Sequence, residues 1–481
     1  EMLITNRTGA YCSTTLVGCN IRKYDGLLVI PVPELDDENH VLLSSLDETI
    51  IQHGAEFNLG LHKYQGENYS PKGHKYIVSF EWEQVPTWTY RVGGVLLRKE
   101  LSFDTSIHRI YVRYTLLDAH SETTLRLRPF LAFRSVRQWT HENNVANKSY
   151  DEVENGIRMC LYQGYPDLYM QTSKVNDWHY CPDWYRGMDY PKERERGYNA
   201  TEDLLVPGYF EMPIKKGESI VFSAGIAPIE AKEINALMEK EISQIDHRDS
   251  FYHCLVNAAH QFRVNKDNES YILAGYPWFK PRARDTFISL PGLTLAIGEK
   301  ERFEEYMATA AKGIQNFINK EPMSVDIYEM EQPDTLLWAT WTIQQYAKYT
   351  SRKVCYEKYG KLFKDIMDYI WNGGHPNLFI HDNRLLYANG RDKAITWMNS
   401  QSGGRPIVPR SGYIVEFNAL WYNALKFFEQ LIDENGSEEY QGLKEEVAKT
   451  AEKVAQSFKE VFLNEYGYLL DYVDGQMMDW S

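Results

Sequence analysis

The first half of the chain alternates apolar and polar residues with a period of two. The alternation is clearest over residues 110–116 and again over residues 125–133, and the polar stretch 118–122 between them is suited to a turn. Similar short runs follow the same rule at residues 76–83, 94–103 and 219–227. A period of two is typical of a strand with one buried face. Many short antiparallel strands of this kind predict a β-sandwich rather than a parallel sheet.

Beyond about residue 230 the apolar positions follow the period of a helix. The spacing i, i+3, i+4 is sustained over residues 303–318, 356–370 and 443–461, and further helices fit residues 250–264, 334–350 and 416–432. The connecting segments are long and rich in Gly, Pro, Asn and Trp: 269–284, 321–333 and 373–415. Long loops on a regular scaffold are where binding and catalysis usually lie. We therefore expect a β-sandwich domain at 1–230 and a helical domain at 231–481.

Composition and charge narrow the class of protein. Of 481 residues, 43% are hydrophobic and 25% charged, which is ordinary for a globular protein and excludes a mainly disordered chain. The net charge of −15 argues against a nucleic-acid partner, because phosphate binding needs a basic face. The longest uncharged apolar stretches, such as 26–33 and 290–298, are shorter than the ~20 residues that cross a bilayer. The opening residues lack a basic region followed by an apolar one, so we expect neither a signal peptide nor a membrane partner.

The cysteines indicate a reducing compartment. Six cysteines are scattered along the chain and none forms a CxxC pair, so neither a zinc site nor a redox motif is expected. Such scatter in a large chain is typical of buried, reduced thiols in the cytoplasm. No motif requires a metal or an organic cofactor.

Aromatic residues are unusually frequent, and their distribution points to a ligand class. They make up 14% of the chain, with 34 Tyr and 12 Trp. Three loop-to-helix segments combine Trp and Tyr with Arg, Asp and Glu: 274–292, 328–338 and 394–425. Carboxylates can hold pairs of hydroxyls while flat rings cover the C–H faces of a sugar. The segments suit a neutral polyhydroxylated ligand, and the alternative is that they serve as ordinary helix caps and loop anchors.

Two long motifs in these segments carry a specific resemblance. The chain reads AGYPWF at 274–279 with RDTFISLPGL at 284–293, and TWMN at 396–399 with PRSGYIVEFNALWYNAL at 409–425. In the amino-terminal half it reads TNRTGAY at 5–11, RKYDGLLV at 22–29 and LLSSLDE at 42–48. These stretches resemble the glycogen debranching enzyme family in its short prokaryotic form, the amylo-α-1,6-glucosidase type. The likeness runs through nearly the whole chain.

The resemblance implies a fold and an incomplete domain. The family joins an amino-terminal antiparallel β-sandwich to an (α/α)6 toroid, with the site in the mouth of the toroid. The helical period after residue 230 agrees with this independently. A toroid of this kind needs twelve helices, whereas about 250 residues accommodate only about eight. The family normally continues past the YVDG stretch with an R-P-N segment and more helices. We therefore expect a toroid truncated at Ser481, and the missing part is one place for the catalytic base.

The implied reaction raises a question at one residue. Inverting hydrolysis needs two carboxyl groups ~6.5–9.5 Å apart, one as general acid and one as general base. By resemblance the acid is the Asp of TWMD, but here the position holds Asn399, and an amide cannot donate a proton in this way. Candidate replacements in the same segments are Glu329, Glu331, Asp334 and Glu416. Spacing does not select among them, and each could instead be an N-cap or an ion-pair partner. Asp334 in particular could cap the helix that follows it.

Other positions are candidates for sugar binding. By resemblance, Arg284 and Asp285 hold the hydroxyls of the terminal glucose, with a buried ion pair as the alternative role. Arg410 is placed at the same site. The family has Trp-Gly before Arg-Asp, whereas this chain has Arg282 and Ala283, so one aromatic contact is lost or replaced by a cation.

Three tryptophans are candidate stacking platforms for the sugar. They are Trp278, Trp338 and Trp397. Packing in the protein core is the alternative role for each ring.

Two functions of different class follow. The first is a debranching hydrolase that removes single α-1,6-linked glucose from glycogen, a limit dextrin or a branched maltooligosaccharide. The second is a catalytically weak α-glucan-binding relative, indicated by Asn399 and the absent carboxyl-terminal segment. The negative charge disfavours acidic polysaccharides. We expect no glucanotransferase activity, because the ~250 residues of alternating strand and helix that such a barrel requires are not present.

Overall fold

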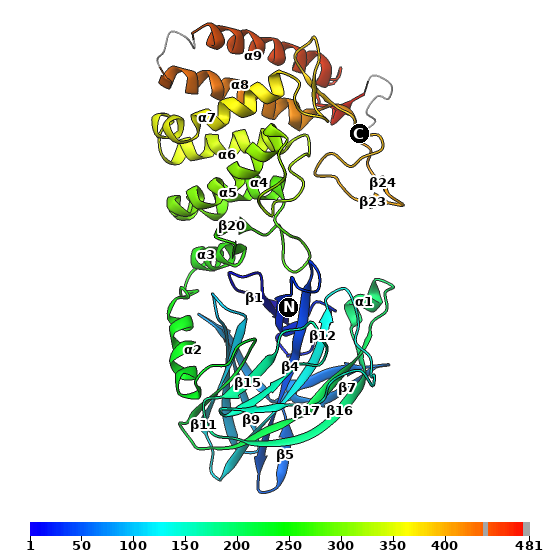
Figure 1. Ribbon diagram of the computed structural model, residues 1–481, viewed down its shortest axis with the longest axis vertical. Coiled ribbons are helices and arrows are strands. Elements are labelled where there is room, and N and C mark those ends of the chain that lie inside the picture. The colour runs from blue at the N-terminus through cyan, green and yellow to red at the C-terminus, as the bar shows by residue number, and fades with distance from the viewer. Residues whose placement is uncertain (436–440, 475–481) are drawn as a thin grey trace. The chain divides into compact units, whose positions relative to one another are not determined.

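The computed structural model describes residues 1–435 and 441–474, which divide into two compact units, Glu1–Asn265 and Lys266–Ser481 (Figure 1). In the described residues, the first unit contains a ten-stranded and an eight-stranded antiparallel sheet. The order in the larger sheet is β1 (Met2–Thr5), β2 (Tyr11–Thr14), β3 (Gly26–Pro31), β4 (Asn39–Gln52), β12 (Thr123–Ser135), β17 (Thr201–Ile214), β16 (Asp177–Asp189), β6 (Leu61–Tyr64) and β7 (Asn68–Lys72), with β5 (Ala55–Asn58) paired to β4. The order in the smaller sheet is β13 (Asp151–Val153), β14 (Gly156–Met159), β15 (Leu168–Thr172), β18 (Ser219–Gly225), β11 (Arg109–Asp118), β10 (Val95–Phe103), β9 (Pro86–Val92) and β8 (Ile77–Trp82).

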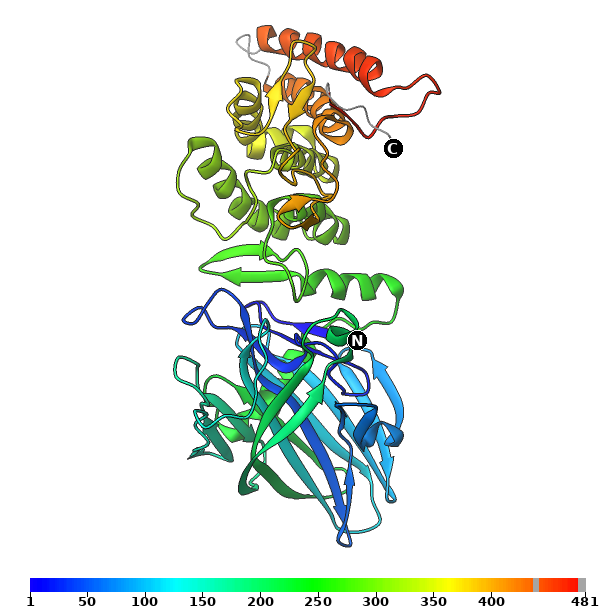
Figure 2. The ribbon, with the colours of Figure 1, turned by 90° about the vertical axis from the view of Figure 1, so that its right-hand side faces the viewer.

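The core of this unit lies between the two sheets. Leu43 and Leu127 of the larger sheet share one buried cluster with Leu97, Val112 and Phe222 of the smaller sheet. All five belong to the apolar sets of their strands, so the period of two places them on the inner faces. Each predicted run of alternation forms a strand, and the predicted β-sandwich is confirmed (Figure 2).

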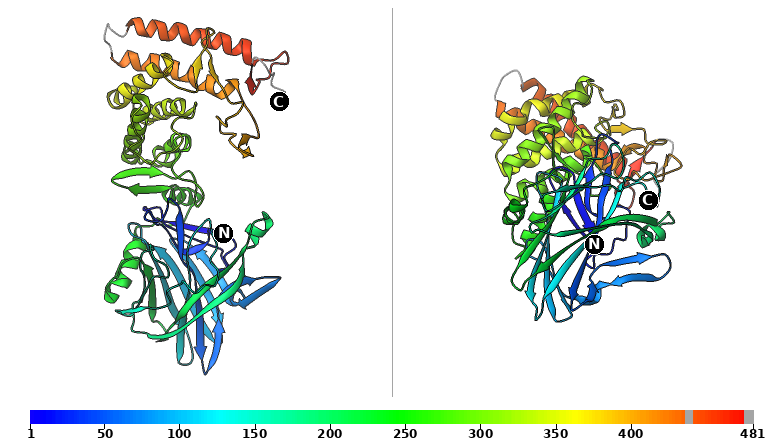
Figure 3. Two further views of the ribbon diagram at one scale, coloured as in Figure 1. Left: turned by 45° about the vertical axis from the view of Figure 1, so that its right-hand side comes forward. Right: turned by 60° about the horizontal axis from the view of Figure 1, so that its bottom comes forward.

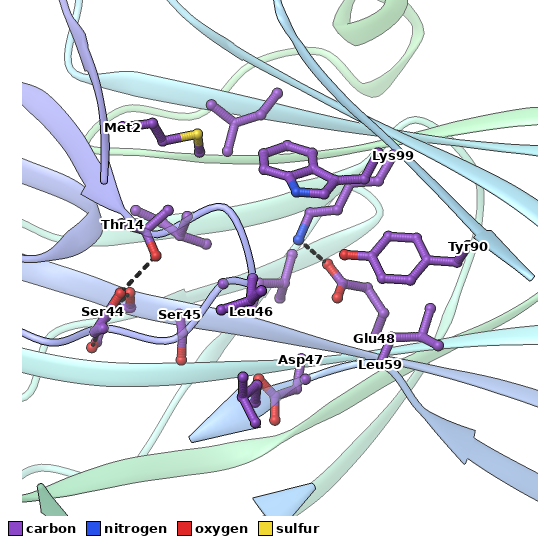
Figure 4. Close-up of a pocket in the computed structure, with 18 residues that line it drawn as sticks. Met2, Thr14, Ser44, Ser45, Leu46, Asp47, Glu48, Leu59, Tyr90 and Lys99 are labelled. Carbon is purple, nitrogen blue, oxygen red and sulfur yellow. Dashed lines mark hydrogen bonds and ion pairs between the residues drawn. The ribbon is translucent and has the colours of Figure 1, made fainter. Parts of the chain in front are cut away.

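A buried charged group interrupts this apolar core. The ammonium of Lys99 on β10 lies 2.5 Å from a carboxylate oxygen of Glu48 on β4, and the Tyr114 hydroxyl donates to the same oxygen over 2.6 Å. In Figure 4 the Lys99 and Glu48 side chains point toward each other beside Tyr90, at the edge of an internal cavity of about 30 Å³. Burial, and then the charge of Glu48, raises the pKa of Tyr114 well above its usual value, so the phenol remains a donor. The group ties the two sheets together.

The change to helical periodicity near residue 230 does not coincide with the division between the units. Helix α2 (Ile234–Ser243) buries Ile234 and Met238 against Tyr111 and Val221 of the smaller sheet. The apolar face of α2 therefore packs against the β unit. The first unit also includes η1 (Gly73–Tyr76), α1 (Pro191–Glu195), η2 (Ala231–Glu233) and α3 (Phe251–Gln261), and β19 (Arg263–Lys266) begins at its end. The division falls after Asn265 rather than near 230.

The second unit is mainly helical. Its helices are α4 (Ala283–Leu293), η3 (Leu295–Ile297), α5 (Lys300–Asn319), α6 (Thr335–Tyr349), α7 (Arg352–Trp371), α8 (Val415–Asn435) and α9 (Gln441–Phe462). Short strands occupy the loops: β20 (Glu269–Ile272), β21 (Phe379–Ile380), β22 (Leu386–Ala388), β23 (Gln401–Ser402), β24 (Arg405–Pro406), β25 (Gly412–Ile414) and β26 (Tyr472–Val473). The predicted helices are all present. No helix in the described part of the chain combines the length and apolar character needed to cross a bilayer.

The helices form two rows. Helices α4, α6 and α8 pack side by side, while α5, α7 and α9 each pair with a member of that row (Figure 3). The hydroxyl of Thr342, about two turns into α6, donates to the carbonyl of Phe287, about one turn into α4, over 2.6 Å. Side chains of Gln344 and Asn423 join α6 to α8 at equal depth in each helix.

The helical rows confirm the predicted fold class. In the described residues the long helices make three hairpins, half of the six in an (α/α)6 toroid. The chain end at Ser481, on which the expectation of truncation rests, lies outside the described residues.

The buried ion pair between the sheets should contribute strongly to stability. Replacing Lys99 with Met leaves the Glu48 carboxylate buried and unpaired, so we expect the free energy of unfolding to fall by about 3–5 kcal/mol. Lys192→Met is the matched control, since Lys192 and Glu195 form an exposed pair whose loss should change stability by less than about 1 kcal/mol. Urea unfolding followed by circular dichroism measures both. Equal destabilisation by the two substitutions would contradict this view of the core.

Candidate functional site

Three candidate carboxylates of the second unit lie at the starts of α4, α6 and α8, the helices that pack side by side. Asp285 lies in the first turn of α4, Asp334 at the N-cap position of α6, and Glu416 in the first turn of α8. In Figure 1 the loops that precede these three helices lie on the right-hand side of the helical unit. These helix starts are therefore the centre of the candidate site.

One buried ion pair joins α4 to α6. The Arg284 guanidinium makes two parallel hydrogen bonds to the Asp334 carboxylate, both of 2.8 Å, and the indole N–H of Trp338 donates to the same carboxylate over 3.2 Å. Burial lowers the pKa of Arg284, but its hydrogen bonds to Asp334 and the charge of that group more than compensate and raise it. Bidentate geometry of this kind is the strongest form of ion pair. Arg284 and Asp334 thus bind each other. This is the buried ion pair considered above as the alternative role of Arg284.

Asp334 does not cap its helix through its side chain. It occupies the N-cap position of α6, but no capping hydrogen bond is formed. Its two oxygens are directed instead to Arg284 and Trp338. The capping role considered for Asp334 is therefore wrong, because the ion pair takes both of its oxygens.

Asp285 differs from its neighbour. It is exposed, and its carboxylate forms no hydrogen bond or ion pair within the described residues. Consecutive residues at the start of a helix point in different directions. The buried Arg284 side chain consequently fixes the first turn of α4 while Asp285 faces outward. Its oxygens can accept hydrogen bonds from a bound ligand.

Two of the loops are joined by backbone pairing. Arg282 and Tyr328 form a parallel bridge, with the Ala283 N–H donating to the Tyr328 carbonyl over 2.9 Å. The Arg282 guanidinium lies 4.6 Å from the ring centre of Phe279 and 3.7 Å from a carboxylate oxygen of Glu329. The cation at this departure from the family motif therefore packs on a ring. The same pairing holds the loop before α6 beside the loop before α4.

Glu331 has no partner of this kind. It is exposed, in the loop that leads into α6, and accepts no hydrogen bond in the described part of the chain. Among the four carboxylates proposed as replacements for the acid, Glu331 is the most accessible. Glu329 faces Arg282, and the other two are held by arginines.

A second arginine ties three segments together. Arg410 is buried and binds both oxygens of Glu416, at 2.5 and 2.7 Å. It also binds both oxygens of Asp471, at 2.8 and 2.6 Å. Burial lowers the pKa of Arg410, and the two carboxylates reverse this and raise it. The sequence predicts Arg410 at the sugar site, but its guanidinium is bound by these two carboxylates.

Asp471 is a residue that the sequence does not single out. It lies 61 residues from Arg410, in a segment without a motif that would mark it. Strand pairing brings the two together, since β25 pairs with β26 and the Val415 N–H donates to the Asp471 carbonyl over 3.1 Å. Only this pairing of distant segments could have revealed it.

The loop between α7 and α8 carries the residue at the acid position. Ile395 and Thr396 are buried, whereas Trp397 is 62% exposed and Asn399 is also exposed. The Met398 N–H donates to the hydroxyl of Thr396 over 3.2 Å. No hydrogen bond or ion pair within the described residues joins Trp397 or Asn399 to α4 or α6. The structure brings Arg284, Asp334 and Trp338 into contact.

The three candidate stacking rings have different surroundings. Trp278 is 40% exposed and Trp397 more so, which leaves a ring face accessible on each. Trp338 is half-buried, held through its N–H by Asp334 and packed edge-on against Trp341 at 5.6 Å. Trp278 and Trp397 can therefore stack on a ligand, whereas Trp338 is held in place by its protein contacts.

In the described part of the chain, no group of three or more His, Cys, Asp or Glu side chains is arranged to hold a metal ion.

Comparisons with known proteins identify the family. Residues 1–221 match the family model described as glycogen debranching enzyme N terminal, and residues 255–480 match amylo-alpha-1,6-glucosidase. No curated protein matches the chain.

Three solved structures resemble the chain weakly, each at 10% sequence identity. A bacterial glucoamylase complexed with acarbose has a TM-score of 0.49, over 98% of this chain and 69% of its own. A glycosyl hydrolase of the gh92 family has a TM-score of 0.33, over 97% and 63%. A polysaccharide lyase has a TM-score of 0.22, over 95% and 81%. With TM-scores below 0.5, none of these likenesses supports an inference about this chain.

The two family models follow one another along the chain and leave only a short segment between them unmatched. The first model lies within the β unit, and the second begins at residue 255, inside the β unit, and continues into the helical unit. The chain belongs to the glycogen debranching enzyme family and, through its amylo-α-1,6-glucosidase region, to the glycoside hydrolases.

Proposed function

We propose that this protein removes single α-1,6-linked glucose residues from glycogen or a limit dextrin by hydrolysis. The observation that carries the proposal is the exposed, unpartnered Asp285 carboxylate at the start of α4, held in place by the buried pair of Arg284 and Asp334 within the described residues. A carboxylate that has no protein partner can accept two hydroxyls of a terminal sugar. The family match to an amylo-alpha-1,6-glucosidase supports the substrate class.

Sugar binding in this proposal uses Asp285 and the exposed rings. Asp285 accepts hydrogen bonds from the terminal glucose, and the faces of Trp278 and Trp397 cover its C–H surfaces. Arg284 acts as a positioning residue, since its guanidinium is already bound to Asp334. The ligand is neutral, in keeping with the net charge of −15.

Inverting hydrolysis then needs a proton donor and, ~6.5–9.5 Å away, a carboxylate that activates water. Asn399 occupies the donor position of the family motif but cannot supply the proton. Asp334 and Glu416 each have both oxygens engaged with arginine N–H groups, which leaves neither free to carry and deliver a proton. We therefore propose Glu331 as the donor, because it is exposed beside the start of α6. Glu416 and Asp334 become positioning residues.

The alternative proposal is an α-glucan-binding relative with little catalysis. The exposed amide of Asn399 at the acid position favours it. A panose-like trisaccharide and a limit dextrin separate the two proposals. Glucose release with the β-anomer appearing first in NMR supports inverting hydrolysis, whereas tight binding of maltooligosaccharide without glucose release supports the alternative. A cytoplasmic location stays a prediction.

Asp285 should be essential for glucan binding. Asp285→Asn removes one charge-assisted hydrogen-bond acceptor, so we expect the Kd for a maltooligosaccharide to rise about 10- to 100-fold. Glu301→Gln is the matched control, because Glu301 is also an exposed acid in the first turn of a helix, α5, outside the candidate site. Calorimetric titration measures both. Equal affinity for the Asp285 variant and the wild type would mean that Asp285 has no role in binding.

Under the alternative proposal, in which the chain lacks a proton donor, restoring a carboxyl at position 399 should accelerate hydrolysis. Asn399→Asp is nearly isosteric, and general acid catalysis typically contributes ~10²–10⁴-fold, so we expect kcat on α-1,6 stubs to rise with little change in KM. Steady-state glucose release measures both constants. A wild type that is already fast, and an Asn399→Asp variant that is no faster, would show that the proton comes from another residue.

The proposed donor can be tested in the same assay. Glu331→Gln should lower kcat by ~10²–10⁴-fold at unchanged maltooligosaccharide affinity, because the amide keeps the shape but cannot donate. Glu357→Gln, at an exposed position on α7, should have no effect. An unchanged kcat for the Glu331 variant would show that Glu331 is not the donor. Glu416 would then be the next candidate, and its bond to Arg410 would have to break during the reaction.

A further inference from the structure

A groove lies between the carboxyl-terminal halves of α5 and α7. It consists of two adjoining hollows of about 710 and 470 Å³, which share Tyr369 and Gly374. Volumes of this order are typical of sites for small ligands. None of the residues that line it is a candidate site residue. We call it the α5–α7 groove, and the lining residues that matter here are Phe317, Asn319, Asp365, Tyr369, Asn372 and Phe379.

The larger hollow is walled by aromatic rings. Phe317 packs edge-on against Tyr369 at 5.7 Å and against His375 at 5.4 Å, and Phe379 at the rim is 45% exposed. Burial lowers the pKa of His375 to about 4, so this wall is uncharged at neutral pH. The Asn377 N–H donates to Nδ1 of His375 over 3.1 Å and fixes the ring. The hollow therefore offers fixed aromatic faces with an accessible ring at its edge.

The smaller hollow is lined by amides and carboxylates. One oxygen of Asp365 accepts from Gln315 and Lys361, and its second oxygen accepts no hydrogen bond within the described residues. The exposed amides of Asn319 and Asn372 likewise make no side-chain hydrogen bond in the described chain. Donors and acceptors are thus available side by side, while the lysine offsets the carboxylate charge.

We propose that the α5–α7 groove is a second binding site, for a linear segment of neutral α-glucan. Rings that cover C–H faces, next to amides and a carboxylate oxygen that hold hydroxyls, match the chemistry of a glucose chain. Charges in and beside the groove nearly balance, which gives no preference for an ionic polymer: Lys320, Lys361 and Lys364 against Glu321, Asp365 and Asp368. The identification of the chain as α-glucan rests on the proposed function.

A second site changes how a branched particle is held. A glucan long enough to engage the groove and the helix starts of α4 and α6 is bound at two points, and linked sites raise apparent affinity without any new contact. A trisaccharide is too short to benefit. The groove should therefore affect glycogen and leave panose hydrolysis unchanged.

The experiment compares the wild type with the double variant Phe379→Ala/Asn372→Ala in native gels containing glycogen. Both residues are exposed, so the fold should be preserved, and circular dichroism verifies this. We expect glycogen to retard the double variant about tenfold less than the wild type, in line with the loss of a stacking face and a hydrogen-bonding amide. The matched control is Phe251→Ala, which removes an exposed ring from α3, outside the groove, and should leave retardation unchanged.

Panose hydrolysis separates this proposal from the proposed function. Loss of retardation with unchanged panose turnover supports both. Loss of retardation in a protein that never releases glucose from panose supports the groove and overturns the hydrolase. Unchanged retardation of the double variant overturns the proposal that the groove binds glucan, whatever the rate of panose hydrolysis. The single variant Asn372→Ala should lose part of the retardation by glycogen. If neither the single nor the double variant loses retardation, the groove is not a sugar site.

Discussion

The site depends on one buried interaction, the bidentate pair between Arg284 and Asp334. Taking two charges out of water costs several kcal/mol per ion in general, and only near-ideal geometry with further hydrogen bonds offsets that cost. Here two parallel bonds of 2.8 Å and a third from Trp338 supply them. Because one partner starts α4 and the other starts α6, the pair fixes the relation between the two helix ends. The outward position of Asp285 follows from the inward position of its neighbour.

Arg410 forms a second buried set of ion pairs, at the start of α8. Its guanidinium holds Glu416 and Asp471, so it fixes the start of α8 to the segment that leads into β26. The two arginines thereby sort the acidic groups of the site into two kinds. Asp334, Glu416 and Asp471 are tied down as structural carboxylates, while Asp285 and Glu331 remain accessible. Chemistry that needs a free carboxyl is confined to the second kind, a distinction that motif spacing alone does not make.

The elements were predictable because their signals are local. A period of two placed β10, β11, β12 and β18, and a spacing of i, i+3, i+4 placed α5, α7 and α9 within a few residues of their ends. What a helix packs against is not local. The apolar face of α2 reads like that of any helix, yet it covers the smaller sheet, which moves the division of the units from about residue 230 to 265. Likewise, the pairing of Arg410 with Asp471 depends on strands β25 and β26 meeting across 61 residues, and no spacing rule anticipates it.

The loop with Asn399 combines a fixed base with an uncovered tip. A Cβ at Gly390 would come within 1.9 Å of the Arg410 carbonyl oxygen, and Gly412, at φ +93°, leaves a Cβ no more than 2.3 Å from the carbonyl of Val473. Only glycine fits these close backbone approaches, so the base of the loop is tightly packed. Trp397 and Asn399 at its tip have no such cover. A carboxyl at the position of Asn399 would lie in water, where nothing raises its pKa toward the value that a general acid needs at neutral pH. Desolvation there has to come from the bound glucan itself, when a glucose ring covers Trp397. In the Asn399→Asp variant, as for the exposed Glu331, proton donation would therefore depend on desolvation by the bound substrate.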